Sequence, residues 1–295
     1  MIGDALSVIR YHIIGVAMVA AVVFGWLFAG EHYFALALVV GIDWFVINLA
    51  NRITDIGEDL ANDIRGTKRV ASHPRVVALI CVVALVGSFI WTWQVWPELT
   101  GVRVAVQLLG LVYNVRLIWT PRGFTRLKEL YFFKNTGSAA IFVLTCFVYP
   151  LVVSGGPVAS SWSAVAVLGC FFVPFELTYE IIYDLRDLEG DRAEGIPTYP
   201  VVHGPGRAVQ IIDGLLVASA LVLIGGFVAA VIGVRELLML AAPGIQFAYY
   251  RARLARGLTS SDCIRITHLG TGLLLFYLLG NWVWLELGLP ANLSL

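Results

Sequence analysis

Long apolar segments alternate with short polar ones along this chain of 295 residues. A helix that crosses a bilayer needs about 20 predominantly apolar residues. Nine runs come close to that length or exceed it, so we predict nine transmembrane helices in one bundle. The eighth run is the shortest and is interrupted by Pro243 and Gly244. The runs cover residues 11–29, 33–51, 76–96, 101–118, 136–153, 161–183, 209–231, 235–250 and 266–286.

The composition supports an integral membrane protein. Hydrophobic residues make up 59% of the chain and charged residues 14%, whereas a soluble globule of this length needs more polar surface. The net charge of zero gives no indication of a nucleic-acid partner. The first run has no small-residue cleavage site, so we interpret it as a spanning helix and not as a signal peptide. The four cysteines show no CxxC spacing and predict neither a metal site nor a disulfide.

Basic residues predict the orientation of the bundle. With nine spans, all but two of the twenty Lys and Arg residues fall on the side of the N-terminus, the exceptions being Arg103 and Arg235. The positive-inside rule makes that side cytoplasmic. We therefore expect the N-terminus inside, the C-terminus outside and a central cavity open to the cytoplasm, in the cytoplasmic membrane of a prokaryote.

Acidic residues recur at helical spacing where the second and sixth runs end. Within and after the second run, Asp43, Asn51, Asp55 and Asp59 follow at steps of eight, four and four, which places them on one face of a helix. Asp63 continues the same stripe. The sixth run carries a second stripe with steps of four, four, three and four, formed by Glu176, Glu180, Asp184, Asp187 and Asp191.

Local physics opposes both stripes, because like charges four residues apart destabilise a helix and acids interact badly with its C-terminal dipole. Such a conflict is typical of a functional site with an external compensating charge. Mg²⁺ suits this role, since it binds a few carboxylates and keeps positions for water and phosphate. The alternative is a pair of solvated helix ends whose acids form surface ion pairs. The partners in that case would be Arg52, Arg65, Arg186 and Arg192.

Three segments resemble the UbiA superfamily of intramembrane prenyltransferases. NRITDIGED is similar to its first motif, NxxxDxxxD, and DLRDLEGDRAEGIPTYPVVHG to its second, DxxDxxxD, with the tail that follows it. RLKELYFFKN matches the basic segment between helices four and five. The resemblance covers essentially the whole chain and implies a single transmembrane domain, residues 1–295.

The resemblance implies an Mg²⁺-dependent transfer of a prenyl group from an isoprenoid diphosphate to an acceptor. The motifs would bind Mg²⁺ and, through it, the diphosphate. Two positions depart from the family pattern: Arg52 stands where Asp is frequent, and Tyr11 replaces the Pro of an Arg-Pro pair common in members that prenylate aromatic acids. Arg52 could contact phosphate directly. Asp63 lies outside the motif. The residues carried over as candidate metal ligands are Asn51, Asp55, Asp59, Asp184, Asp187 and Asp191.

Prenyl transfer through ionisation needs positive charge at the leaving diphosphate and a dry, aromatic pocket for the cation. Lys134 is the favoured diphosphate ligand, because it lies nearest an apolar run within the matched segment. Tyr179 and Tyr183 flank the second stripe and are the favoured pocket residues. Glu176, Glu180 and Asp43 lie deeper in the bundle than the two motifs. For each of them three roles are open: contact with the acceptor, a base that takes up a proton, or a hydrogen-bonded acid of the core. The other nominated diphosphate ligands are Lys68, Arg69, Arg126 and Lys128.

Two other functions fit the same residues. A terpene cyclase of the same superfamily would capture the cation with the donor's own double bonds. A cation-coupled transporter would also need acidic helices, but transporter sites usually lie near the bilayer midplane, whereas most of these acids lie at a helix end. The identity of the acceptor and the length of the donor chain are not encoded in these motifs.

Overall fold

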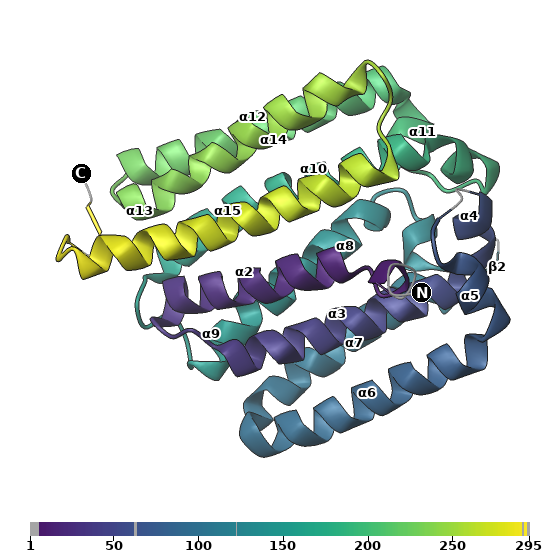
Figure 1. Cartoon of the computed structure of the whole chain (residues 1–295), viewed down its shortest axis with the longest axis horizontal. Coiled ribbons are helices and arrows are strands. Elements are labelled where there is room, and N and C mark those ends of the chain that lie inside the picture. Colours follow the sequence, from purple (N-terminus) through teal and green to yellow (C-terminus); the bar gives the residue numbers. More distant parts are fainter. Residues whose placement is uncertain (1–5, 62–63, 122, 291, 294–295) are drawn as a thin grey trace.

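The computed structural model describes residues 6–61, 64–121, 123–290 and 292–293. Long helices run side by side in a bundle, with α6 at one edge and α12 and α14 at the other (Figure 1). The first half contains α2 Tyr11–Ala29, α3 Phe34–Thr54, α4 Ile56–Ala61, α5 Thr67–Ser72, α6 Pro74–Val95, η1 Pro97–Leu99, α7 Thr100–Asn114, β1 Ile118–Thr120, β2 Gly123–Thr125 and η2 Leu127–Glu129. The second half contains α8 Phe133–Val143, η3 Leu144–Val148, α9 Tyr149–Val153, α10 Trp162–Ala193, α11 Tyr199–His203, α12 Pro205–Val228, α13 Val234–Leu237, η4 Leu238–Leu240, α14 Ala241–Leu254 and α15 Ser260–Glu286.

Seven of these helical segments are long and apolar enough to cross a membrane, among the residues described. Two of the nine predicted spans, α7 and α14, form helices of 15 and 14 residues. The helix of the eighth run continues through Pro243 and Gly244. The count of nine therefore stays a prediction for these two elements. Apolar side chains such as Val83, Ile90 and Leu221 are exposed on α6 and α12, which is expected where helices face lipid.

The structure is mostly helical, in agreement with the predicted fold class, but one loop forms two short strands. The end of the fourth run and the residues after it form a two-stranded antiparallel hairpin, in which Ile118 pairs with Thr125 and Thr120 with Gly123. The hairpin lies beside α4 and α5 at the end of the bundle where α3 and α10 also end (Figure 1). It leads directly into the basic segment that begins at Arg126.

The two acidic stripes differ in their backbone. The second lies on one helix, because α10 is continuous through Ala193 and Ser161 caps its first turn by accepting a hydrogen bond from the amide of Ala164 at 3.1 Å. The expectation of a single first stripe is wrong in detail. The helix breaks at Asp55, whose φ and ψ are −108° and 21°, and resumes as α4. Asp63 lies outside the described residues.

Close packing of α3 against α7 brings polar residues of both helices together. A Cβ atom on Gly110 would lie 2.8 Å from Cγ1 of Ile47, so only glycine permits this approach. One helical turn further on, Asn51 donates a hydrogen bond to Oδ1 of Asn114 at 2.9 Å. The glycine thus positions the first motif against the fourth predicted span.

A buried ion pair joins α3 and α7 in the middle of the bundle. The carboxylate of Asp43 accepts hydrogen bonds from Arg103 Nε at 3.0 Å, from the Tyr149 hydroxyl at 2.9 Å and from Gln107 at 2.9 Å. Arg103 also donates to Thr92 Oγ1 at 2.7 Å, and both charged side chains are fully buried. Of the interpretations open to Asp43, the structure supports the hydrogen-bonded core acid. It also explains why Arg103 departs from the positive-inside pattern.

Candidate active site

One cavity of about 1020 Å³ extends from the acidic end of the bundle into its interior. Its mouth is charged, while its inner wall carries aromatic and aliphatic side chains of α2, α3, α8, α10, α14 and α15. Of the predicted site residues, eleven line this cavity: Asn51, Arg52, Asp55, Asp59, Lys128, Lys134, Glu176, Tyr179, Tyr183, Asp184 and Asp187.

Four predicted site residues lie elsewhere. Arg126 and Asp191 stand behind the wall and contact residues that line it. Lys68 and Arg69 are exposed on α5 and border a separate, smaller hollow. The structure therefore does not bring Lys68 and Arg69 into the cavity lining.

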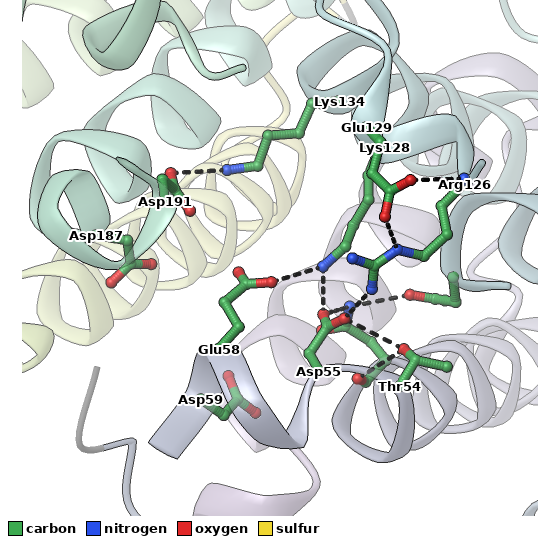
Figure 2. Close-up of polar contacts among 12 residues, drawn as sticks. Thr54, Asp55, Glu58, Asp59, Arg126, Lys128, Glu129, Lys134, Asp187 and Asp191 are labelled. Carbon is green, nitrogen blue, oxygen red and sulfur yellow. Dashed lines mark hydrogen bonds and ion pairs between the residues drawn. The ribbon is translucent and has the colours of Figure 1, made fainter. Parts of the chain in front are cut away.

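Basic side chains from the loop before α8 hold Asp55. Lys128 Nζ lies 2.6 Å from one carboxylate oxygen of Asp55, and Arg126 lies 2.8 Å from the other. Lys128 also contacts Glu58 at 2.9 Å, and Asn51 donates to Asp55. Figure 2 shows Lys128 and Arg126 pointing toward Asp55 from the same side. This arrangement places the positive charge of Lys128 at the cavity mouth beside the first motif, with Arg126 behind it.

Glu129 fixes the orientation of Arg126. It accepts hydrogen bonds from Arg126 Nε at 2.8 Å and from the Thr125 hydroxyl at 2.6 Å. Burial alone would raise the pKa of Glu129, but these hydrogen bonds and the positive charge of Arg126 outweigh burial and lower the pKa to about 2. Glu129 is therefore ionised at neutral pH, and its charge keeps the guanidinium in place.

Lys134 connects two acids of the second motif. Its Nζ atom lies 2.6 Å from Asp184 and 3.2 Å from Asp191. Asn135, the next residue on α8, donates to the other oxygen of Asp184 at 2.8 Å. The third acid, Asp187, forms a bidentate ion pair with its neighbour Arg186. The basic segment that resembles the family thus reaches both motifs, through Lys128 and Lys134.

The last acid of the first motif faces a different set of cations. Arg52 lies 2.7 Å from Asp59 and Arg10 lies 3.9 Å from it. The surface ion pairs considered for the sequence therefore form at Arg52, Arg186 and Arg192, the last with Glu189 at 3.0 Å. Asp59 is 5% exposed, however, so its pair with Arg52 lies inside the protein and not on a solvated helix end.

The chemistry of the acidic residues suits Mg²⁺, although their present contacts are with basic side chains. Among the residues described, no three His, Cys, Asp or Glu side chains form a ready metal site. Two buried acceptor oxygens beside Lys134, Oδ1 of Asp191 and Oδ1 of Asn135, nevertheless accept no hydrogen bond. An acceptor buried without a donor is costly unless a cation can bind it. Carboxylate and amide oxygens are ligands that Mg²⁺ takes, so the residues present fit this ion.

The deeper predicted residues lie on the aromatic wall. Glu176 and Glu180 face the cavity about two turns and one turn before Asp184, respectively, and Glu180 accepts a hydrogen bond from the Ser138 hydroxyl at 2.7 Å. Tyr179 lies between the two acids in sequence, and Tyr183 bonds to Thr267 on α15 at 2.9 Å. Further in, Phe172 packs against Phe142, Phe147, Phe175 and Phe24, with ring centroids 5.3 to 6.3 Å apart.

Sequence reasoning missed several residues at the mouth. Asn114 and Asn135 are polar side chains inside or beside apolar runs, and that isolation is itself a signal. Arg186 lies between Asp184 and Asp187 of the second acidic stripe, and the sequence indicates it only as a partner in a surface ion pair. His12 and His268 lie 256 residues apart, and nothing in the local sequence indicates that they meet. Their contact depends on how α2 and α15 pack.

Comparisons with known proteins agree on one family. The model described as the UbiA prenyltransferase family matches residues 46–279. A digeranylgeranylglyceryl phosphate synthase of Natronomonas pharaonis is 30% identical over 177 residues, which cover 59% of this chain and 58% of that protein. The enzyme of the same name from Halobacterium salinarum is 30% identical over 194 residues, or 63% of each chain. The aligned part thus spans about three fifths of these curated relatives.

Solved structures show the same fold. A UbiA homologue from Archaeoglobus fulgidus bound to GPP and Mg²⁺ superposes with a TM-score of 0.70 at 17% identity, over 93% of this chain and 97% of that one. A structure of digeranylgeranylglyceryl phosphate synthase gives a TM-score of 0.57 at 15% identity, over 94% and 95% of the two chains. Together with the family match over most of its length, the fold establishes that this chain is an integral membrane protein that belongs to the UbiA prenyltransferase family.

Proposed function

We propose that this chain transfers a prenyl group from an isoprenoid diphosphate to an acceptor within the membrane, in a reaction that requires Mg²⁺. The observation that carries this proposal is the cavity, which joins a mouth of acids and cations to an apolar, aromatic interior. A prenyl diphosphate has the same two parts, a charged head and an apolar chain. The cavity volume of about 1020 Å³ is at the upper end of the range for small-molecule sites, which suits a long chain.

The cations at the mouth stabilise the leaving diphosphate. Lys128 and Lys134 line the cavity and are already held by carboxylates, so their positive charges are fixed before the substrate arrives. Preorganised charge in a site that excludes water lowers the barrier to forming a charged leaving group. Asn51, Asp55, Asp59, Asp184, Asp187 and Asp191 would hold Mg²⁺. When bound, this ion supplies Lewis-acid stabilisation of the diphosphate oxygens.

The interior then receives the allylic cation. Trp44, Tyr113, Phe172, Phe175 and Tyr179 all line the cavity, and aromatic faces attract a cation that has lost its solvent. Two other aromatic residues beside Lys134, Phe132 and Phe133, are 58% and 46% exposed and lie outside the lining. The aromatic wall also excludes water, which would otherwise capture the cation.

Glu176 or Glu180 accepts the proton that the acceptor loses. Both carboxyl groups line the cavity beyond Asp184, on the same face of α10. A hydroxyl that attacks the cation must release a proton to a base within hydrogen-bond reach. The hydrogen bond from Ser138 holds Glu180 in a defined position.

The curated relatives favour transfer over cyclisation. Their name describes a glyceryl phosphate that carries two geranylgeranyl groups, and such a product requires an acceptor. By this likeness we infer a geranylgeranyl diphosphate donor and a glycerol-based acceptor. The transporter alternative gains no support, since Asp43, the deepest acid considered, is paired with Arg103 inside the protein.

Purified protein should release diphosphate from geranylgeranyl diphosphate in the presence of Mg²⁺ and a geranylgeranylglyceryl phosphate acceptor, and chelation of Mg²⁺ should reduce release to background. Asp55→Ala and Asp187→Ala are expected to lose most of the activity. Glu189→Ala is the matched control, because Glu189 lies two residues from Asp187 on the same helix with its side chain 83% exposed. Release without acceptor, with a cyclic hydrocarbon as product, would support the cyclase. No release under any condition, or full activity in both Asp variants, would contradict both enzymes.

We also propose that the cavity mouth faces the cytoplasm. In a chain whose four native cysteines are replaced, a cysteine introduced at Lys68, which is exposed at the mouth end, should react with an impermeant maleimide in inside-out vesicles but not in intact cells. Val158 is 72% exposed in the loop between α9 and α10, at the opposite end of the bundle (Figure 1). Val158→Cys should show the reverse pattern, and the same pattern at both positions would contradict the orientation.

A further inference from the structure

A second group of arginine and histidine side chains lines the cavity mouth, apart from the lysines that contact Asp55 and Asp184. It consists of Arg10, His12, Arg52, Arg186 and His268, called the histidine–arginine cluster below. These residues come from the start of α2, the end of α3, the last third of α10 and the first half of α15. Figure 2 shows Asp59 and Asp187, the acids of this side, with no contact to Lys128 or Lys134.

Aromatic contacts bring the two histidines together. The ring centroids of His12 and His268 lie 6.2 Å apart, and Tyr11 stands against both rings at 5.6 and 5.3 Å. The Tyr11 hydroxyl and His268 Nε2 share a hydrogen bond of 2.9 Å. Arg10, Arg52 and Arg186 all lie close enough to His12 to interact with it electrostatically. The cluster is therefore one compact site formed by four helices.

Two atoms of the cluster are buried without a partner. His12 is 7% exposed and its Nδ1 atom makes no hydrogen bond with the described part of the chain. Arg52 is 3% exposed, and the same holds for its Nε–H donor. A buried donor without an acceptor costs about 1–3 kcal/mol, more when the group is charged. Both side chains border the cavity, so an acceptor group of a ligand can reach them.

The charges of the cluster favour an anion. Asp59 pairs with Arg52 and Arg10, and Asp187 pairs with Arg186, so two carboxylates face three guanidinium groups. Arg265, which is exposed at the rim of the same cavity, adds a further positive charge. Arginine forks match the oxygens of a phosphate, and histidine supplies an additional donor.

The wall beyond the cluster is apolar. From His268 the lining continues along α15 through Leu274 and Tyr277 toward the other end of the helix. An amphiphile with an anionic head at the cluster would thus place its chain along α15. The lysine side of the mouth, with its carboxylates and unpartnered acceptor oxygens, stays available for the diphosphate of the donor.

We propose that the histidine–arginine cluster binds the phosphate head of a phosphorylated lipid acceptor, and so determines that the acceptor is an anion. This proposal rests on the proposed prenyl transfer. It also explains Arg52, which replaces an acid of the resembled family motif with a cation.

Binding without turnover tests the cluster. An alkylglycerol phosphate in detergent should bind the purified protein. Arg52→Gln and His12→Phe should each raise the Kd of this lipid by roughly 10-fold or more, as expected for the loss of a hydrogen bond to a charged group. The alkylglycerol without phosphate should bind weakly and equally to all three proteins. Arg207→Gln and His73→Phe, at exposed positions outside the cavity lining, are matched controls. Arg52→Lys should recover part of the affinity, which a general loss of fold would not allow.

Steady-state kinetics separate the acceptor from the donor. The acceptor KM of His12→Phe should rise at least 10-fold while the donor KM changes by less than 2-fold. His12→Phe is used for this comparison because Arg52 also holds Asp59, a proposed Mg²⁺ ligand. An equal rise in the donor KM, unchanged binding in both variants, or inorganic phosphate binding as tightly as the lipid would overturn the proposal. If the phosphorylated lipid binds as expected but no diphosphate is released, the cluster is supported and the prenyl-transfer proposal fails.

Discussion

Replacing Lys134 with methionine is expected to slow diphosphate release by roughly 100- to 1,000-fold, the loss typical of removing one preorganised donor at a site of developing charge. Lys134 lies 2.6 Å from Asp184 and 3.2 Å from Asp191, so it is held at the cavity mouth before a substrate binds. Methionine preserves the unbranched shape of the side chain but removes its charge. The substitution also leaves Asp184 and Asp191 without their cation, and the negative charges of these two acids then repel the incoming diphosphate.

Single-turnover release of diphosphate from geranylgeranyl diphosphate measures this effect on the chemical step. Arg192→Met is the control, because it also removes a positive charge near the end of α10, at a side chain that is 54% exposed. Its rate should stay within about 2-fold of that of the unmodified protein, as expected for an exposed ion pair. A rate for Lys134→Met within 5-fold of the unmodified rate would show that Lys134 has a structural role only.

The second large effect concerns stability. Asp43→Ala is expected to lower the free energy of unfolding by about 3–5 kcal/mol, because it leaves Arg103 charged and fully buried without its partner. Tyr149 and Gln107 would also lose their acceptor. The double variant Asp43→Leu/Arg103→Met should recover most of this loss, since apolar residues of similar volume often replace a buried ion pair without cost.

Denaturant unfolding of the protein in detergent, followed for Asp43→Leu, Arg103→Met and the double variant, gives the coupling between the two residues. Glu189→Ala is a control at an exposed pair and should change stability by about 0–1 kcal/mol. Additive losses in the double variant would contradict the view that Asp43 and Arg103 stabilise the bundle as a pair. Asp43 would then again be a candidate for a role in the reaction.

Much of the fold could be predicted because lipid imposes a simple rule on sequence. Each segment must satisfy its backbone within one helix, so apolar length reveals a span directly. The rule is less informative for α7 and α14, whose helices are short, and for residues 118–125, where the hairpin lies outside the apolar helices. At the site, periodicity correctly placed Asp184, Asp187 and Asp191 on one helix, but it did not reveal the break at Asp55.

The partners of the acids could be predicted only in part. Arg52 and Arg186 lie close to their acids in sequence, and both were considered as ion-pair partners. Lys134 was favoured as a ligand of diphosphate, but its contacts with Asp184 and Asp191 join residues 50 and 57 positions apart. Lys68 and Arg69 satisfied the same charge rule as Lys128, yet they lie on α5, outside the cavity.

The sequence by itself determined which segments enter the membrane, which of their ends carry the charged residues, and which acids share a helical face. These properties follow from local periods and from the cost of burying charge, and both are encoded within single segments. The tertiary structure alone decided that Asp43 meets Arg103, that His12 meets His268, and which cation holds each acid. The physical reason is that helix periodicity fixes the direction of a side chain relative to its own axis, whereas its partner depends on how neighbouring helices pack and rotate against each other.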